Sequence, residues 1–422
     1  MNRKFYSLSK TRRHFCTLVF LICTSYLAIA QATDASIRGV VKEAGGITSP
    51  AANVLLKNVS TGFETGMVTN ANGEYRFRQL PLGGPYEITV SFVGFGPQKR
   101  ENLTLNQRDE LIINFQLKAS ATQLETVVIT DDGVTSSIDR QGESTLISTQ
   151  QIANLPTEGR NFTRLTSLSP LQGGGSINLG GQRRTSTSVT IDGLNARNTL
   201  TAGEIGRGPY TISQEAIRTF EISTNDYDVT QGRQGGGAIR AVTKSGTNTL
   251  EGSAFVYHRN DNLQSDLDIR GENRVADFDN TQYGFSLGGP IIKDKLHFFT
   301  VYEQQDATDP IFIADIRSDA DEDRLGITQT NLDRFLQIAR DSYGVSSAQQ
   351  VGQFERSSKA NTWFARIDWQ LNDVHRLTIR NNWNKYARPF NTSDNSSFEL
   401  AESWSDFESQ ENTFGVSLRS AF

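Results

Sequence analysis

The chain has 422 residues, with 42 lysines and arginines against 47 acidic residues and a formal net charge of −5. Five of the basic residues and both cysteines, Cys16 and Cys23, lie within the first thirty positions. The rest of the chain therefore offers no disulfide and no thiolate metal site, and its acidic balance argues against a nucleic-acid partner. The mean hydropathy is −0.44, and beyond the first thirty residues no apolar run could form a helical span. Strands remain possible, because the alternating residues of a β-barrel keep its mean hydropathy low.

The first thirty residues follow the three-part pattern of a secretory signal. A basic start precedes a short apolar core at residues 15–27, and Ala28-Ile29-Ala30 places small residues at the two positions that a signal peptidase reads. A membrane anchor is the alternative, but the core is shorter than a span of ~20 residues and no stop-transfer flank follows it. We expect residues 1–30 to be a signal peptide that is cleaved after Ala30.

Residues 31–120 predict one small all-β domain. Short stretches that alternate apolar and polar residues recur at regular spacing, for example at residues 37–41, 86–90 and 111–115. Residues 70–74 (Asn-Ala-Asn-Gly-Glu) predict a turn that closes a hairpin, because Asn-Gly tolerates positive φ. Several short strands with turn signals between them predict a β-sandwich.

These residues resemble the carboxypeptidase-regulatory-like, transthyretin-like domain. The resemblance is carried by Gly39-Val40-Val41 and by residues 50–54, 69–75 and 90–95, and it covers nearly the whole segment. It implies a non-catalytic accessory domain. Asn72 stands where the family has an acidic residue, which argues against a calcium-binding turn.

A β-branched stretch follows within residues 121–133. Extended structure is predicted for its central residues, which are Glu125, Thr126, Val127, Val128 and Ile129. The pattern alone leaves two interpretations open. The stretch is either the last strand of the domain before it, or a strand offered to a partner chain by strand addition.

Residues 134–250 predict a second unit of mixed α/β structure, rich in Gly, Ser, Thr and Asn. Ser148 is a good N-cap for a helix at residues 149–153, and a further helix is predicted through Leu165 and Leu168 until Pro170 stops it. Glycine runs divide the rest into short strands and loops. So many polar loops in an ordered unit suggest that another part of the protein encloses it.

This second unit resembles the plug domain of the TonB-dependent outer-membrane receptors. The resemblance is carried in order by residues 155–162, 180–183, 191–194, 215–222 and 235–244, and details at Asn161-Phe162 and residues 245–248 are similar to the Oar-like (OmpA-related) branch. It implies that residues 121–133 form a linker holding the TonB box at residues 125–129. The plug residues implied are Gly159, Arg160, Asn161, Phe162, Asp192, Gly193, Gly235, Gly236 and Gly237.

Residues 251–422 predict strands of an outer-membrane β-barrel. Stretches such as residues 365–371 and 414–419 place Arg, Asp and Gln on one face and apolar residues on the other, which suits a polar interior and contact with outer-membrane lipid. Tight turns at residues 293–295 and 372–374 alternate with long connections, as short periplasmic turns alternate with long external loops. The strands are expected to be about ten residues long.

Six barrel strands are predicted, whereas a barrel that encloses a plug needs roughly 22. We therefore expect the sequence to be an N-terminal fragment of a longer protein. The fold class predicted is mainly β: a signal peptide, a small sandwich, a mixed α/β plug and the first strands of a large antiparallel barrel.

The sequence offers no basis for an enzyme, a cofactor or a metal centre. The histidines show no ligand spacing, the glycine runs lack the Gly-Lys-Ser/Thr ending of a phosphate loop, and no nucleophile elbow is present. The acidic residues between 315 and 323 could bind a divalent cation, but a solvated external loop is favoured because the turn glycine of a calcium loop is missing.

The predicted function is energy-coupled import of an unidentified ligand across the outer membrane of a Gram-negative cell. The resemblance implies that TonB, with its inner-membrane energising complex, pulls the strand near Val127 and rearranges the plug. One alternative is a surface adhesin, a structural protein or a secretion-associated outer-membrane protein. A passive porin is a further alternative, but it would not need residues 134–250.

Overall fold

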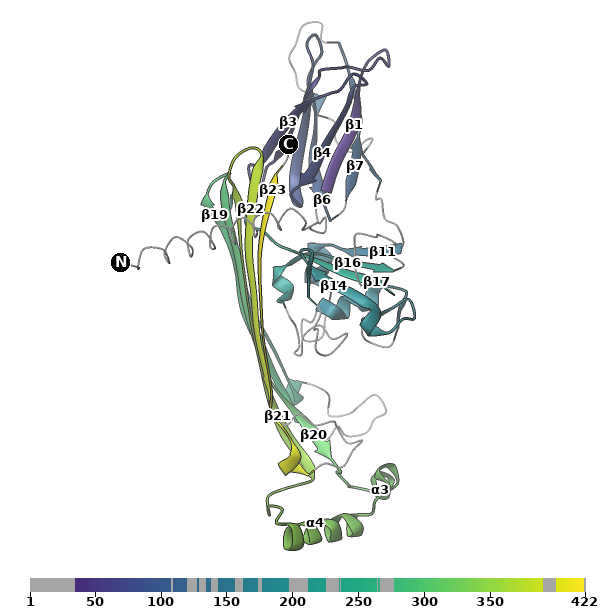
Figure 1. The fold of residues 1–422 in the computed structure, drawn as a ribbon, viewed down its shortest axis with the longest axis vertical. Helices are drawn as coiled ribbons and strands as arrows, with labels where there is room; N and C mark the ends of the chain where they lie inside the picture. The colour runs from purple at the N-terminus through teal and green to yellow at the C-terminus, as the bar shows by residue number, and fades with distance from the viewer. Residues whose placement is uncertain are drawn as a thin grey trace, which may run out of the picture.

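A computed structural model places the described chain in three bodies, an N-terminal β-sandwich, a small mixed unit and a long curved sheet (Figure 1). The predicted signal peptide lies outside the described residues. The described residues are 35–107, 109–119, 127–128, 134–137, 143–155, 162–173, 177–196, 212–224, 235, 237–263, 265, 277–389 and 400–420.

The N-terminal sandwich consists of two packed sheets. One sheet has the order β10-β7-β1-β4, with β8 also paired to β1, and the other has the order β3-β2-β5-β6-β9. The strands are β1 (Ala35–Glu43), β2 (Asn53–Asn58), β3 (Glu64–Val68), β4 (Glu74–Leu80), β5 (Gly83–Ser91), β6 (Gln98–Leu105), β7 (Glu110–Ile113), β8 (Phe115–Leu117), β9 (Val127–Val128) and β10 (Val134–Ser137).

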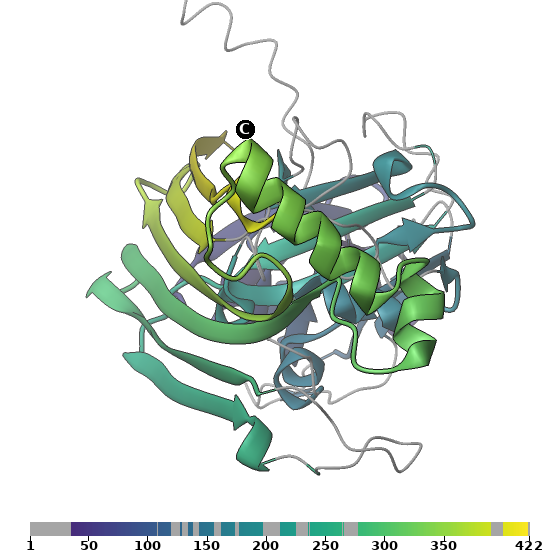
Figure 2. The ribbon, with the colours of Figure 1, turned by 90° about the horizontal axis from the view of Figure 1, so that it is seen from below.

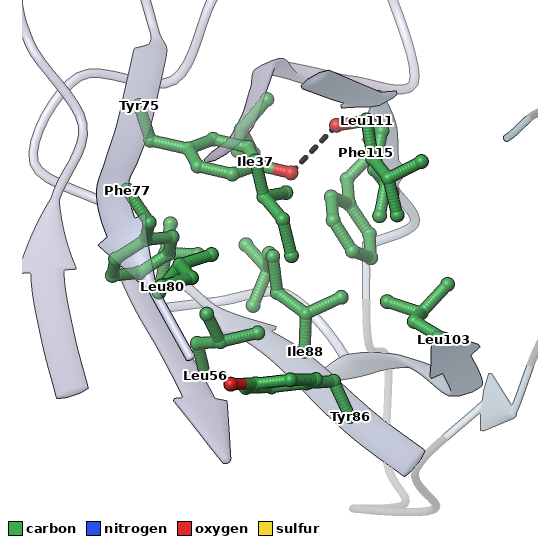
Figure 3. Packing of buried hydrophobic residues seen from close by; sticks show 14 of the residues in the cluster. Ile37, Leu56, Tyr75, Phe77, Leu80, Tyr86, Ile88, Leu103, Leu111 and Phe115 are labelled. Atoms are coloured by element: carbon green, nitrogen blue, oxygen red, sulfur yellow. Dashed lines mark hydrogen bonds between the residues drawn. The ribbon is translucent and has the colours of Figure 1, made fainter. Parts of the chain in front are cut away.

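The sandwich core follows from the alternation of its strands. In β2 every second residue is buried, so Val54 and Leu56 point inward while the residues between them face solvent. Figure 3 shows Leu56 and Ile88 from one sheet facing Ile37 from the other. The Tyr75 hydroxyl lies within this core and donates a 2.6 Å hydrogen bond to the carbonyl of Ile113, which satisfies a polar group that burial would otherwise penalise.

The predicted hairpin at residues 70–74 is wrong, although the turn itself is present. Gly73 has φ of +71°, and its N–H donates to the carbonyl of Asn70. The strands on either side do not pair with each other, because β3 pairs with β2 and β4 pairs with β1. The turn therefore carries the chain from one sheet of the sandwich to the other.

The second body, called the plug unit here, contains a five-stranded sheet of order β11-β16-β17-β14-β15. Ser148 caps α2 through a capping box with Gln151, as its sequence position predicts. The second predicted helix is a 3-10 helix, η3. The elements are β11 (Glu143–Ile147), α2 (Thr149–Asn154), η3 (Phe162–Leu168), β12 (Gln172–Gly173), β13 (Asn178–Leu179), η4 (Arg184–Ser186), β14 (Thr187–Ile191), β15 (Leu194–Asn195), η5 (Gln214–Ala216), β16 (Ile217–Thr224) and β17 (Gly237–Thr243).

The third body is a six-stranded antiparallel meander, called the barrel sheet here, which curves along one side of the plug unit (Figure 2). Its connections alternate between tight and long, as predicted. The strands reach 19 residues, so the expected length of about ten is too short. The elements are β18 (Glu251–Asn260), η6 (Asp261–Leu263), β19 (Asp279–Ile292), β20 (Leu296–Ile313), α3 (Asp319–Leu325), α4 (Gln329–Tyr343), β21 (Gly352–Gln370), β22 (His375–Arg388), η7 (Ala401–Ser403) and β23 (Phe407–Ser420).

The two faces of the barrel sheet differ in the way that the alternation predicts. On β19, Tyr283 and Phe285 are exposed on the outer face, while Gln282 and Ser286 are buried on the face toward the plug unit. On β23, the exposed positions include Phe414 and Val416. The predicted mainly-β fold class is confirmed, with an apolar outer face suited to lipid. Within the described residues, no helix has the length and apolar character that crossing a membrane requires.

Candidate functional site

The plug unit and the barrel sheet meet at the end of β14, where the predicted plug residues Asp192 and Gly193 form a tight turn. Both have positive φ, +47° at Asp192 and +79° at Gly193, and this returns the chain into β15. The Asp192 carboxylate accepts hydrogen bonds of 2.8 Å from the backbone N–H and from the hydroxyl of Thr243. Asp192 thus ties the end of β14 to the end of its neighbour β17.

Arg380 on β22 of the barrel sheet contacts the same carboxylate. Its Nη1 lies 2.7 Å from Asp192 Oδ2, and its Nη2 donates a 2.8 Å hydrogen bond to the carbonyl of Ile191. The two charged side chains are only 11% and 14% exposed. Because water screens this ion pair little, it is worth more than a surface pair.

A second arginine on the next strand strengthens the contact. Arg366 on β21 donates a 2.9 Å hydrogen bond from Nη1 to the hydroxyl of Thr243, and its Nε and Nη2 form a two-pronged pair with Asp368 at 2.7 and 2.9 Å. Thr378 on β22 donates to the same carboxylate at 2.9 Å. We call Asp192, Thr243, Arg366, Asp368 and Arg380 the latch.

The latch lies in a region with more positive than negative charge. Arg218 on β16 is nearby, and its Nη2 donates a 3.1 Å hydrogen bond to Ser245. Burial and the neighbouring Arg366 charge lower the pKa of Arg218, while Asp368 and Asp192 oppose that change. The two latch carboxylates therefore offset three nearby guanidinium groups, and neutralising Asp192 would leave Arg218 of the plug unit and the two barrel arginines with only Asp368 to offset them.

A further polar contact lies along β20. Glu303 is fully buried, and its carboxylate accepts hydrogen bonds from the Ser213 hydroxyl of the plug unit and from the Gln282 amide of β19. Ser213 is also the N-cap of η5, since its oxygen accepts from the Glu215 N–H at 3.2 Å. The same hydroxyl therefore fixes a plug element and attaches it to the barrel wall.

Apolar packing joins the two bodies as well. Phe299, Val301 and Phe364 of the barrel sheet belong to the hydrophobic cluster of the plug unit, together with Phe220 and Ile239 of its central strands. Burial of such side chains stabilises the contact by roughly 1.5–3 kcal/mol each. The interface therefore combines a buried apolar part with a largely buried charged part.

The other sequence-predicted residues fall into two groups. Gly235 and Gly237 are described, and a Cβ at Gly237 would lie 2.7 Å from the Ser223 carbonyl and 3.0 Å from Leu179, so β16 and β17 approach too closely for a side chain there. Phe162 opens η3. The remaining plug residues lie outside the described part of the chain, namely Gly159, Arg160, Asn161 and Gly236.

The predicted coupling strand is described only at its centre. Val127 and Val128 form β9, which pairs in parallel with Gln98 and Lys99 of β6 in the N-terminal sandwich. Glu125, Thr126 and Ile129 lie outside the described residues. In its pairing, therefore, β9 belongs to the sandwich sheet, as the first of the two sequence interpretations expects.

Sequence reasoning missed the barrel side of the latch. It placed Arg366 and Asp368 on the polar face of their strand, but it assigned no partner to them or to Arg380. The available signal was the spacing of Arg366 and Asp368, two charged residues two positions apart on a strand face predicted to enclose another unit. Within the described residues, no group of three His, Cys, Asp or Glu side chains could hold a metal ion. In the acidic loop, Asp315 pairs with Arg317 at 2.7 Å and Asp321 with Arg324 at 2.9 Å.

Comparisons with known protein families match two separate parts of the chain. Residues 36–118 match the family described as carboxypeptidase regulatory-like domain, and residues 242–314 match the outer membrane beta barrel domain. The TonB-dependent transporter Oar of Myxococcus xanthus is 30% identical over 293 residues, which are 65% of this chain and 27% of that protein. This chain therefore spans about a quarter of the length of the curated relative that it matches.

Two solved outer-membrane proteins match this chain at low identity. A ferric enterobactin receptor (PfeA) mutant of Pseudomonas aeruginosa is 12% identical, with a TM-score of 0.45 over 67% of this chain and 39% of that one. The outer membrane transporter YddB of Escherichia coli is 16% identical, with a TM-score of 0.42 over 65% and 36%. The sequence matches carry the comparison: the chain is an outer-membrane protein that is similar to the TonB-dependent transporter Oar and contains a carboxypeptidase regulatory-like domain.

Proposed function

We propose that the protein imports a ligand across the outer membrane by rearranging its plug unit, driven by TonB and the inner-membrane complex that energises it. The ligand binds the plug unit and the external loops. TonB pairs with the strand at residues 125–129 from the periplasm and pulls. The chemistry is binding and mechanical work, with no covalent step.

The observation that carries the proposal is the latch between Asp192 and Arg380. A plug that only filled the barrel could be held by apolar contacts alone. Here its central strands end on a charged network whose partners lie on two barrel strands, with distances of 2.7–2.9 Å at Asp192, Thr243 and Arg366. Charged hydrogen bonds of this kind contribute about 1.5–3 kcal/mol each and can be replaced by water once the interface opens. A packed interface of this type switches between discrete arrangements.

The chain order supplies the mechanical connection. The strand β9 precedes β11, the first strand of the plug sheet, and β11 pairs with β16 over residues 143–147. Tension applied near Val127 therefore enters the plug sheet at its edge. From β16 it reaches β17, and Thr243 at the end of β17 is a latch residue bonded to Asp192.

The experiment compares two single variants of the complete protein for capture by the purified periplasmic domain of TonB from the same organism. Strand addition depends on main-chain N–H and C=O groups, and proline removes one donor and fixes φ. Val127→Pro should therefore abolish capture, while Thr126→Ala, which keeps the backbone able to pair, should be milder. Both should reach the outer membrane in wild-type amounts.

Two outcomes would contradict the proposal. Wild-type capture of Val127→Pro would show that this strand is not the TonB box. Loss of Val127→Pro protein from the outer membrane would show that the strand is needed for assembly instead, which is the result expected if it serves only as the last strand of the sandwich.

A further inference from the structure

The chain between the sandwich and the plug unit is paired with both sheets of the sandwich. β9 adds to the edge of one sheet, with Val127 opposite Gln98 and Val128 opposite Lys99 in parallel register. β10 adds to the edge of the other sheet in antiparallel register, with four consecutive pairs from Val134–Ile113 to Ser137–Glu110. The strand that is proposed to pair with TonB, β9, is thus already paired with β6 of its own chain, and the strand that follows it, β10, is paired with β7.

The order of elements makes this pairing relevant to transport. A pull on β9 reaches β11, and through it the latch, only by way of β10. Because β10 is paired with β7, the tension first acts on the ladder between them, starting at the Val134–Ile113 end. The tension reaches the plug unit only after the ladder between β10 and β7 has opened.

The sandwich is itself attached to the tight-turn end of the barrel sheet. The Ser60 carbonyl accepts a 2.7 Å hydrogen bond from the Asn248 N–H, at the junction between plug unit and barrel. The Asn248 side chain then bonds Asp294 twice, donating from Nδ2 at 2.7 Å and accepting from the Asp294 N–H at 2.8 Å. The first of these hydrogen bonds joins the sandwich directly to this junction, and the other two fix Asn248 to the tight turn of the barrel sheet.

We propose that the N-terminal sandwich holds the coupling segment, the part of the chain that contains β9 and β10, by pairing these strands with β6 and β7. The sandwich thereby competes with TonB for β9. This inference rests on the function proposed above for residues 125–129. The parallel ladder of β9 has only two residue pairs, and short parallel pairing is weak. A partner that offers a longer strand can therefore displace it, while the four pairs of β10 keep the plug unit isolated from weak or transient pulls.

The test uses the complete protein with Lys99→Cys and Val128→Cys combined. These residues are register partners, and directly opposed strand residues lie within the Cα separation that a disulfide bridges. Both native cysteines lie in the first thirty residues, so the new pair has no competitor once the signal is removed.

Oxidation should form the cross-link and abolish capture by the purified TonB periplasmic domain, and reduction should restore it. The reduced and oxidised forms of one variant are each other's control, which allows for loss of the Lys99 ion pairs to Glu87 and Glu101.

A second pair of variants acts in the opposite direction. Thr135→Pro disrupts the ladder of β10 with β7, whereas Thr135→Ala leaves the backbone able to pair. Thr135→Pro should therefore be captured severalfold better than Thr135→Ala, at equal abundance in the outer membrane, because the segment is then held only by the two-pair ladder of β9.

The results separate this inference from the proposed function. Failure of the cross-link to form, equal capture of the oxidised and reduced forms, or equal capture of the two Thr135 variants would each overturn the competition. If the cross-link forms but TonB captures neither form nor the wild type, the proposed function fails, and the competition fails with it. Efficient cross-linking together with capture of only the reduced form supports both the competition and the proposed function.

Discussion

Arg380 of the barrel sheet and Asp192 of the plug unit are in direct ionic contact although 188 positions separate them in the chain, with Nη1 and Oδ2 2.7 Å apart. The same arginine also donates a hydrogen bond to the Ile191 carbonyl, so it contacts both a side-chain carboxylate and the backbone at the turn after β14. Removing either partner leaves a largely buried charge without its counter-ion, and this costs more than the pair itself contributes.

The first prediction concerns this contact. Asp192→Ala should weaken the attachment of the plug unit by about 2 kcal/mol, less than for a fully buried pair because water reaches part of the site. Amide hydrogen exchange in β14 and β17 should then rise by roughly thirtyfold. Lys385→Ala on the same barrel strand is the matched control, because its pair with Glu408 is exposed and should change exchange by less than a few-fold.

A double variant tests whether the effect comes from the pair. If Asp192 and Arg380 act together, Arg380→Ala combined with Asp192→Ala should cost less than the sum of the two single variants. If the free-energy costs of the two single variants simply add, the two residues stabilise the plug unit independently. The contact between them would then contribute no coupling energy.

The second prediction concerns Gly237, at the start of β17. A Cβ there would press on the Ser223 carbonyl and on Leu179, so Gly237→Val should destabilise the plug sheet by about 1–3 kcal/mol. Gly173→Ala is the control, because a Cβ at that position meets nothing within 4 Å. Limited proteolysis of the plug unit in the assembled protein measures the difference, and equal protection of both variants would contradict the close approach of β16 and β17.

The sequence predicted local features well and long-range ones poorly. The capping box of Ser148 and Gln151 depends on four consecutive residues and could be foreseen. The turn at Gly73 could also be foreseen, but nothing in it tells which sheet the next strand joins. Alternation placed Arg366 on the inner face of the barrel sheet, yet its hydrogen bond to Thr243 spans 123 positions and has no periodic signal. Likewise, β-branched residues predicted the extended strand at Val127, but its partner depends on which sheet edge is free.

The third prediction concerns Asp321 in α3, within the long connection between β20 and β21. Hydrogen bonds from the Arg324 side chain, the Arg317 backbone N–H and the Ser318 hydroxyl lower the pKa of Asp321 to about 2. Arg324→Ala should raise that pKa toward its ordinary value near 3.8. A titration of the aspartate carboxyl signals by NMR measures it, with Arg334→Ala on the neighbouring helix as the control. An unchanged pKa in Arg324→Ala would show that the hydrogen bonds from the Arg317 N–H and the Ser318 hydroxyl suffice.

The last prediction concerns pH and the sandwich core. Burial raises the pKa of the Tyr75 phenol far above its ordinary value of 10.0, because the phenolate would lose its hydration. The unfolded chain releases this proton near pH 10 while the folded chain keeps it. The stability that Tyr75 contributes is therefore fully present below pH 10 and is lost as the pH rises above it, by about 1.4 kcal/mol per pH unit. Tyr75→Phe should lose about 1 kcal/mol at pH 8, because the Ile113 carbonyl loses its donor. It should also remove the Tyr75 part of the alkaline decline, so that the difference from wild type shrinks and then reverses between pH 8 and pH 11. Calorimetry of the sandwich transition in both proteins across this range measures the crossing, and a constant difference would show that Tyr75 ionises freely in the folded protein.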